Sequence, residues 1–173
     1  MYRNRRFYLT LVLMTVCCLG ACSNANKNVG TAKKEGAATG SPTSALTKLT
    51  PASVTSSTST PTDPPANAVD GDLNTQWISG SSAPQWLQLD LGQEYLVSKV
   101  RLNILQTPPG PTTHQVFGGP TPETLTLIGI LDDITQDNQW LEFYNSVDHI
   151  RYLKIETVRS PSWVAWREIE VYK

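Results

Sequence analysis

Short runs of alternating apolar and polar residues occupy the chain from residue 48 to residue 173. In the run Trp86–Leu91, the side chains of Leu87, Leu89 and Leu91 fall on one face, as they do in a β-strand that is buried on one side. No segment of this region repeats its apolar residues every 3.6 positions, so helices are not expected there. The pattern therefore predicts an all-β domain.

Turn residues divide this region into seven or eight expected strands. In residues 96–104, the alternation predicts that Leu96, Val100, Leu102 and Ile104 face inward and that Lys99, Arg101 and Asn103 face outward. Other strands are expected at residues 54–56, 124–131, 139–143, 151–158 and 168–172. This number of strands in about 126 residues favours an antiparallel β-sandwich. The largest side chains expected in its core are Trp77, Trp86 and Trp140.

The first 21 residues have the composition of a signal peptide. Three arginines precede an uncharged and mainly apolar stretch, Phe7–Leu19, which as a helix would span only about 20 Å, against a hydrocarbon core of roughly 30 Å. The following positions, Leu19-Gly20-Ala21-Cys22, resemble the bacterial lipobox, in which the cysteine is acylated before cleavage. We expect residues 1–21 to be removed and Cys22 to anchor the protein in a membrane. The alternative is an ordinary secretory signal with an unrelated cysteine.

Residues 22–47 are expected to form a flexible tether. Residues 23–47 contain no aromatic side chain and only Val29 and Leu46 as larger aliphatic ones, which is too little apolar surface for a core. Because the other two cysteines leave with the signal peptide, no disulfide is available to the domain. The expected location is the bacterial cell envelope, and the outer membrane if the source is Gram-negative, since Ser23 rather than an acidic residue follows Cys22.

Charge and motif content exclude several classes of function. The chain has 14 Lys and Arg against 15 Asp and Glu, and residues 48–173 alone have 8 against 14, a net charge of −6, so nucleic acid is not an expected partner. The sequence contains no G-x-S-x-G or H-E-x-x-H motif and leaves no free cysteine for nucleophilic chemistry. The adjacent acids Asp132 and Asp133 are expected in a turn. We therefore expect a protein that is not an enzyme.

Oxygen-bearing side chains are concentrated between Asn67 and Thr75, where the carboxylates of Asp70 and Asp72 lie two positions apart. The spacing is not that of an EF-hand, whose twelfth position would here be Ser81 instead of glutamate. Two interpretations fit these residues equally. One is a Ca²⁺ site, and the other is an Asx-turn in which the aspartates accept hydrogen bonds from backbone amides.

Four blocks of the sequence, taken in order, resemble a known family. They are Asp70-Gly71-Asp72-x-x-Thr75-x-Trp77, Trp86–Gly92, Arg151–Ile155 and Trp166–Tyr172. Together they resemble the discoidin domain, the coagulation factor V and VIII type C family, which is close to the galactose-binding carbohydrate modules of bacterial glycosidases. The resemblance implies a jelly-roll β-sandwich with a structural Ca²⁺ ion. Around that ion it places the carbonyl of Asn67, the side chain of Asp70, Asp72, the oxygens of Thr75, the carbonyl of Arg167 and the carboxylate of Glu168.

The resemblance also implies that ligands bind in loops at one end of the sandwich. We expect these loops at Gln106–Pro120 and Arg159–Trp163, with His114, Arg159 and Trp163 as candidate contacts to carbohydrate. Each candidate has a structural alternative: a tryptophan that covers the core, a buried histidine, and a solvated arginine. The usual His, Arg, Asn and aromatic set of the sugar-binding members is not recognisable, so galactose specificity is not implied.

The sequence thus predicts a membrane-anchored surface lipoprotein whose discoidin-like domain binds carbohydrate. Its expected partners are a carbohydrate or a surface protein, together with the membrane that holds its lipid. The alternative function is a non-catalytic envelope lipoprotein that binds proteins or serves a structural role without binding sugar.

Overall fold

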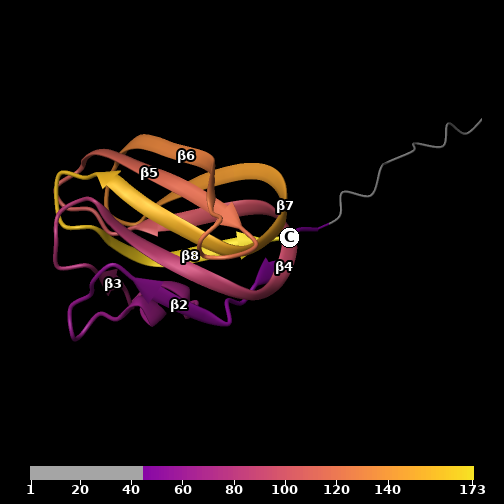
Figure 1. The fold of residues 1–173 in the computed structure, drawn as a ribbon. Helices are drawn as coiled ribbons and strands as arrows, with labels where there is room; N and C mark the ends of the chain where they lie inside the picture. The colour runs from indigo at the N-terminus through magenta and orange to yellow at the C-terminus, as the bar shows by residue number, and fades with distance from the viewer. Residues whose placement is uncertain (1–44) are drawn as a thin grey trace, which may run out of the picture. The chain divides into compact units, whose positions relative to one another are not determined.

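The computed structural model describes residues 45–173, which form one antiparallel β structure (Figure 1). The signal peptide expected at residues 1–21, the expected lipid attachment site Cys22 and most of the expected tether lie outside the described residues. The elements are β1 (Lys48–Leu49), β2 (Ser53–Ser56), the 3-10 helix η1 (Pro65–Val69), β3 (Trp77–Ile78), β4 (Gln85–Ile104), β5 (Gly110–Gly119), β6 (Thr126–Thr135), β7 (Gln139–Arg159) and β8 (Ala165–Tyr172). Within residues 45–173, no helix is long and apolar enough to cross a membrane. The all-β prediction is confirmed.

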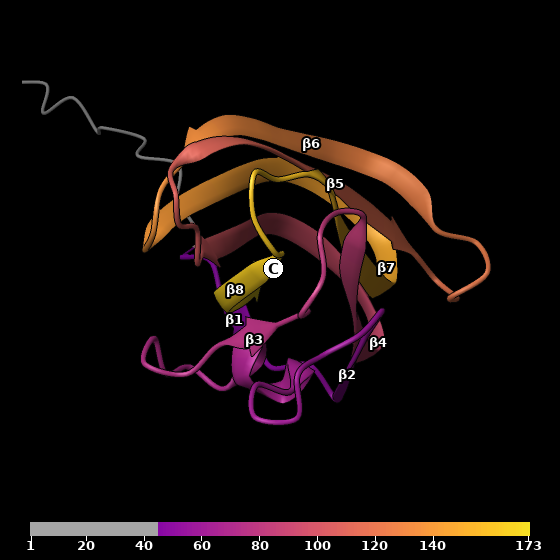
Figure 2. The same cartoon turned by 90° about the vertical axis from the view of Figure 1, so that its left-hand side faces the viewer.

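Two long strands, β4 and β7, connect the layers of the sandwich. The strand order is β1-β8-β4-β7-β5-β6, with β2 added to β4 and β3 added to β8. The first half of β4 pairs with β2 and with the second half of β7, whereas its second half pairs with β8 and the first half of β7. The sheet therefore folds over itself, and Figure 2 shows it from the end, curving round the core. This arrangement confirms the predicted β-sandwich.

The strand β4 does not end after the run Trp86–Leu91 but continues through Gly92. The φ of Gly92, 84°, lies in the left-handed region that glycine adopts without strain, and the pairing with β7 is irregular from Asp90 to Lys99. The irregularity also shifts the alternation of side chains. Val97 is buried and Leu96 is 49% exposed, so the predicted inward position of Leu96 is wrong.

The core otherwise contains the predicted aliphatic residues, including Leu87, Leu89 and Leu102. Trp77 is fully buried, and its ring centroid lies 5.1 Å from that of Trp166. Other expectations about the core are wrong. Trp86 and Trp140 are only half-buried, and the side chains of Lys154 and Arg101, respectively, lie over their rings. Asn103 was predicted to face outward, but it is fully buried and donates a hydrogen bond to Asn138.

Three further segments differ from the sequence prediction. The expected loop Gln106–Pro120 is mostly the strand β5, in which Thr112, His114 and Val116 alternate inward despite the flanking prolines. The two strands expected at residues 139–143 and 151–158 are halves of β7. Asp132 and Asp133 lie inside β6 and not in a turn, because that strand continues to Thr135.

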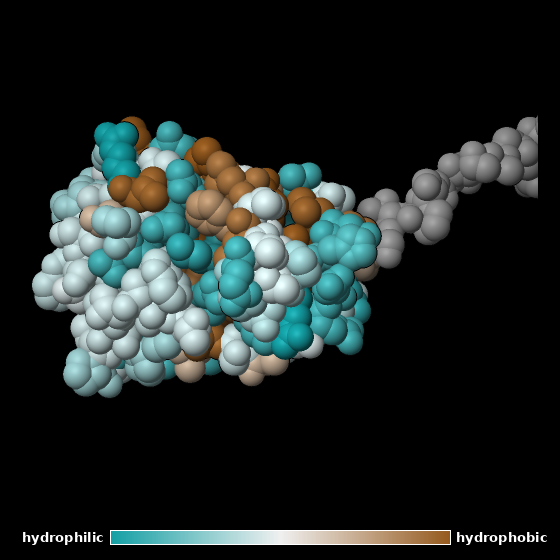
Figure 3. All heavy atoms as spheres, in the orientation of Figure 1, coloured by the Kyte–Doolittle hydropathy of each residue, from teal (hydrophilic) through white to brown (hydrophobic). Residues whose placement is uncertain are grey.

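The strand β6 lies at one edge of the sheet and carries exposed apolar side chains. Leu127, Ile130 and Ile134 are 50%, 54% and 72% exposed. Apolar atoms accordingly gather along the upper side of the molecule in Figure 3, the side on which Figure 1 places β6.

Candidate functional site

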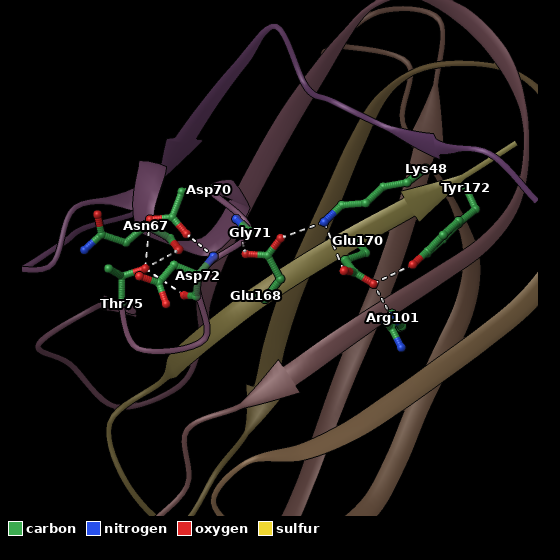
Figure 4. Close-up of polar contacts among 10 residues, drawn as sticks. All are labelled: Lys48, Asn67, Asp70, Gly71, Asp72, Thr75, Arg101, Glu168, Glu170 and Tyr172. Carbon is green, nitrogen blue, oxygen red and sulfur yellow. Dashed lines mark hydrogen bonds and ion pairs between the residues drawn. The ribbon is translucent and has the colours of Figure 1, made fainter.

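The oxygen-rich loop follows η1 and lies against β8 (Figure 4). Three oxygens surround the hydroxyl of Thr75: Asp70 Oδ2 at 2.8 Å, the carbonyl of Asp72 at 2.9 Å and the carbonyl of Asn67 at 3.4 Å. A hydroxyl donates one proton, so only one of these oxygens receives a full hydrogen bond at a time. The carbonyl of Asp72 also accepts from the Thr75 amide at 3.2 Å, so Asp70 Oδ2 and the carbonyl of Asn67 are the two oxygens that compete for the hydroxyl proton.

The same loop contains two Asx-turns. The backbone amide of Asp72 donates to Asp70 Oδ1 over 2.8 Å, and that of Asn74 donates to Asp72 Oδ1 over 2.9 Å. The hydrogen bonds from Asn74 lower the pKa of Asp72. Gly71, between the acids, has a φ of 84°. The Asx-turn interpretation is confirmed, and it leaves Asp70 Oδ2 directed at Thr75.

Glu168 connects this loop to the last strand. Its side chain is almost completely buried, Oε2 accepts a hydrogen bond from the Gly71 amide at 3.1 Å, and Oε1 lies 3.2 Å from Lys48 Nζ. Burial raises the pKa of Glu168, and these two partners act against that rise. Next to it, the guanidinium of Arg167 donates to the carbonyl of Leu73 at 3.2 Å. The oxygen-rich loop and the last strand of the domain thus meet through the hydrogen bond between Gly71 and Glu168.

The donor chemistry of this loop fits a calcium ion. Ca²⁺ takes 6–8 oxygen ligands, among them carboxylates, hydroxyls and backbone carbonyls. Within the part of the chain that the structure describes, no group of three or more His, Cys, Asp or Glu side chains is arranged to hold a metal. Carbonyls and the Thr75 hydroxyl would therefore supply most of the ligands, with the carboxylates of Asp70 and Glu168 as the charged ones.

Beyond Glu168, an ionic network fixes β1 to the sheet. Lys48 Nζ lies 3.0 Å from Glu170 Oε1, and the other oxygen of Glu170 accepts hydrogen bonds from Arg101 and from Tyr172 OH (Figure 4). Burial raises the pKa of Glu170, but the bonds from Arg101, Tyr172 and Lys48 outweigh it and lower the pKa to about 2. Sequence reasoning missed Lys48, because its partners lie 120 or more positions away.

His114 does not lie on a surface loop, so that prediction is wrong. It lies in β5 and is 1% exposed, with Nδ1 2.8 Å from Thr157 Oγ1 and Nε2 3.1 Å from Thr112 Oγ1. Burial lowers the pKa of His114 to about 4. In this position the ring is part of the core, and it does not reach a ligand at the surface.

Arg159 and Trp163 are both exposed, as a binding role requires. Arg159 ends β7, and Trp163, in the β7–β8 loop, is 56% exposed. Both lie at the end of the sandwich opposite the C-terminus, because β8 begins here and ends there (Figure 1). The structure brings together two of the three predicted ligand-binding residues at this end.

The loops at this end support each other. Ser160 Oγ donates to Gln106 Oε1 over 3.0 Å, and Gln106 Nε2 donates to the carbonyl of Pro108 over 2.9 Å. Pro161 packs so closely on Gly110 that a Cβ there would lie 2.9 Å from Pro161 Cγ. Hydrogen bonds and close packing therefore connect the β4–β5 loop to the β7–β8 loop, which carries Trp163.

Sequence reasoning missed a cleft of about 360 Å³ on the outer face of the sheet. It lies over β4, β5 and β7 and is bordered by the β5–β6 loop. Trp86 and Lys154 are among its lining residues. The signal that could have found it is the alternation of β4, because the period that buries Leu87 turns Trp86 outward.

Comparison with known proteins gives the chain a family. The family model described as F5/8 type C domain matches residues 53–169. Among solved structures, the truncated AlyQ with CBM32 and alginate lyase domains is 21% identical with a TM-score of 0.66, covering 75% of this chain and 34% of that chain. The family 32 CBM from C. perfringens NanJ, in complex with galactose, is 18% identical with a TM-score of 0.65. The match covers 75% of this chain and 100% of the NanJ module.

A pectin-binding carbohydrate-binding module is 22% identical with a TM-score of 0.62, covering 71% of this chain and 91% of that one. The chain thus spans about a third of the AlyQ chain and the whole of the NanJ module. Identities this low show a shared fold and nothing finer. No curated protein matches the chain.

Proposed function

The chain belongs to the F5/8 type C domain family, and from that membership we propose that its folded domain is a non-catalytic module that binds carbohydrate. The observation that carries the proposal is the exposed indole of Trp163, in a loop that is hydrogen-bonded to the β4–β5 loop at the end of the sandwich. An aromatic face packs against the C–H surface of a pyranose ring, and planar polar groups bind its hydroxyls. The exposed guanidinium of Arg159 is such a group.

The related structures support carbohydrate as a class of ligand without naming one sugar. The NanJ module is in complex with galactose, the CBM32 of AlyQ is in complex with 4,5-unsaturated mannuronic acid, and the third module binds pectin. Domains of one fold thus take different sugars, which is expected where exposed loops determine specificity. We therefore propose that the ligand of this domain is a carbohydrate, and we assign none of these particular sugars to it.

Substitution of Trp163 by alanine is expected to weaken glycan binding about tenfold or more, because a tryptophan at the centre of a contact is typically worth over 1.4 kcal/mol. The measurement is a glycan array on the purified full-length protein, followed by calorimetric titration of the best ligand. Tyr144→Ala is the matched control, since Tyr144 is 62% exposed but lies in the first half of β7. Absence of binding to every glycan would overturn the proposal and favour a protein-binding or structural role.

We also propose that the loop of Asn67–Thr75 holds a structural Ca²⁺ ion. The gathered oxygens around Thr75 support this proposal, as does the position of Glu168 from the last strand beside the loop. When bound, the ion would neutralise carboxylate charge and connect the loop more firmly to β8. Asn67, Asp70, Asp72 and Thr75 would hold it, with Glu168 and the carbonyl of Arg167 on the β8 side.

The protein is further proposed to be a lipoprotein of the cell envelope. The support is the sequence Leu19-Gly20-Ala21-Cys22 after an uncharged apolar stretch. Substitution Cys22→Ser is expected to move the protein from the membrane fraction to the soluble fraction in a bacterial host, because acyl chains supply the anchoring energy. Immunoblots of the two fractions measure this, with Cys18→Ser as the control. Retention of the Cys22→Ser protein in the membrane would contradict acylation at this residue.

A further inference from the structure

The cleft on the outer face of the sheet is centred on Lys154. In the pairing of the three strands, Lys154 of β7 lies opposite Gln88 of β4 on one side and Phe117 of β5 on the other. These residues face outward because their neighbours Leu87, Leu89 and Val116 are buried in the core. Register and alternation together therefore place the three side chains side by side on the surface.

Two aromatic rings flank the ammonium of Lys154. Its Nζ lies 5.3 Å from the ring centroid of Trp86 and 5.7 Å from that of Phe117, and one of its three donors goes to Glu156 Oε2 at 3.1 Å. Two donors remain for other partners. The side chain is therefore held in place by the protein while it keeps the capacity to bind a ligand.

The remaining wall comes from the β5–β6 loop, which contributes Glu123 and the apolar side chains of Pro122 and Leu125. The volume of about 360 Å³ lies within the range of roughly 300–1,000 Å³ that is usual for small-ligand sites. Apolar and aromatic surface is thus combined with an ammonium, a carboxylate and the carboxamide of Gln88. This combination can both donate to hydroxyls and accept from them.

Charge in the cleft selects among ligands with many hydroxyls. Lys154 is paired with Glu156, and Glu123 adds a further carboxylate, so the local balance is one cation against two anions. The net negative charge would repel an acidic sugar, whereas it would not repel a neutral one. The balance favours an uncharged pyranose.

We propose that this cleft is a second carbohydrate site, separate from the loop end of the sandwich, and that it binds a neutral pyranose. The C–H faces of the sugar pack against Trp86 and Phe117. Its hydroxyls accept hydrogen bonds from Lys154 and donate to Glu123, and Gln88 does both. With Trp163 at the sandwich end, the domain would bind a glycan at two places, which raises its avidity for a polymer above that of either site.

The test follows the indole Nε1–H signals of Trp86, Trp163 and Trp140 in ¹H–¹⁵N spectra of the full-length protein in detergent micelles. The probes are galactose and cellobiose as neutral sugars and galacturonic acid as the acidic one. Each signal is assigned by a single Trp→Phe substitution. Trp140 is the internal control, because it also lies half-buried under a cation, Arg101 at 4.0 Å, but outside the cleft.

The expected result is a saturable shift of the Trp86 signal with a neutral sugar, unchanged in the Trp163→Ala protein, while Trp140 does not move. Lys154→Met, which keeps the length of the side chain, is expected to weaken that binding about tenfold. An unchanged melting temperature shows that the variant is folded.

A Trp86 signal that does not shift with either neutral sugar would overturn the second site. If Trp163 shifted in the same experiment, carbohydrate binding at the loop end would still stand. A Trp86 shift with galacturonic acid alone would overturn the assignment to neutral sugars. Loss of the Trp86 shift in the Trp163→Ala protein would show that one site accounts for the binding, and it would also overturn the proposal.

Discussion

Acidification from pH 7.5 to pH 4.5 is expected to lower the free energy of unfolding by about 2.5 kcal/mol through His114 alone. The buried ring has its pKa lowered to about 4, because an imidazolium without water around it is costly. Its neighbours Thr112, Thr157 and Trp166 carry no charge. The carboxylate of Asp132 raises the pKa slightly but does not offset burial.

The direction follows from where the proton binds. Between pH 6.5 and pH 4 the histidine of the unfolded chain is protonated and that of the folded chain is not. The stability that the neutral ring contributes is therefore complete above pH 6.5, falls as the pH falls, and is lost below pH 4. Urea unfolding curves at half-unit intervals, recorded with chelator present to exclude metal effects, measure this loss.

The variant His114→Gln keeps groups that can bond to both threonines but does not titrate in this range. Its stability is expected to lie below wild type at pH 7.5 and to fall much less on acidification. His149→Asn is the matched control, because that histidine is exposed at the surface and Asn tolerates its positive φ of 58°. Equal pH dependence of wild type and His114→Gln would refute a buried neutral ring.

Calcium at about 100 times its dissociation constant is expected to raise the free energy of unfolding by about 2.7 kcal/mol, or the melting temperature by roughly 10 °C. The oxygens of the loop come together only in the folded chain, so Ca²⁺ binds the folded state and shifts the unfolding equilibrium toward it. Chelator is expected to reverse the shift. Thermal melts of the full-length protein with EDTA and with added Ca²⁺ provide the measurement.

Thr75→Val removes the hydroxyl at the centre of the oxygen cluster and keeps the shape of the side chain, so the calcium shift is expected to disappear. Thr113→Val is the control, because Thr113 donates to Asp132 in β6 at 3.0 Å and takes no part in the loop. Wild-type melts that coincide with and without Ca²⁺ would exclude the ion from the Asn67–Thr75 loop. A shift of equal size in Thr75→Val would place the ion elsewhere.

The predictions that held rest on short-range patterns. Leu87, Leu89 and Leu91 alternate over a regular strand, so the two-residue period alone assigned them to the core. Leu96 was misplaced because the pairing of β4 with β7 is irregular between Asp90 and Lys99. Gly92 marks this stretch in the sequence, but it does not show which side chains the irregularity turns inward. The prolines around β5 gave a loop prediction, which the inward alternation of that strand contradicts.

The oxygen-rich loop was found from the sequence because Asp70, Asp72 and Thr75 are neighbours along the chain. Glu168 was assigned to this site only through the family resemblance. It accepts a hydrogen bond from the Gly71 amide, but 97 positions separate the two residues in the sequence. The burial of His114 was left as one alternative among two, because a single histidine between polar residues does not reveal its depth.

The sequence by itself determined most of the strand-forming segments, the family and the loop whose oxygens lie close together in the chain. Periodicity and spacing are properties of residues that are close in the sequence, so they can be recognised without knowing which strands pair with each other. Only the tertiary structure decided that Lys154 lies between Trp86 and Phe117, that His114 is in the core, and that Trp163 stands on two mutually supported loops. The first two depend on register between strands distant in the sequence, and a shift of one residue would turn the same side chains to the opposite face. The third depends on contacts between loops that are 54 positions apart, as in the hydrogen bond from Ser160 to Gln106.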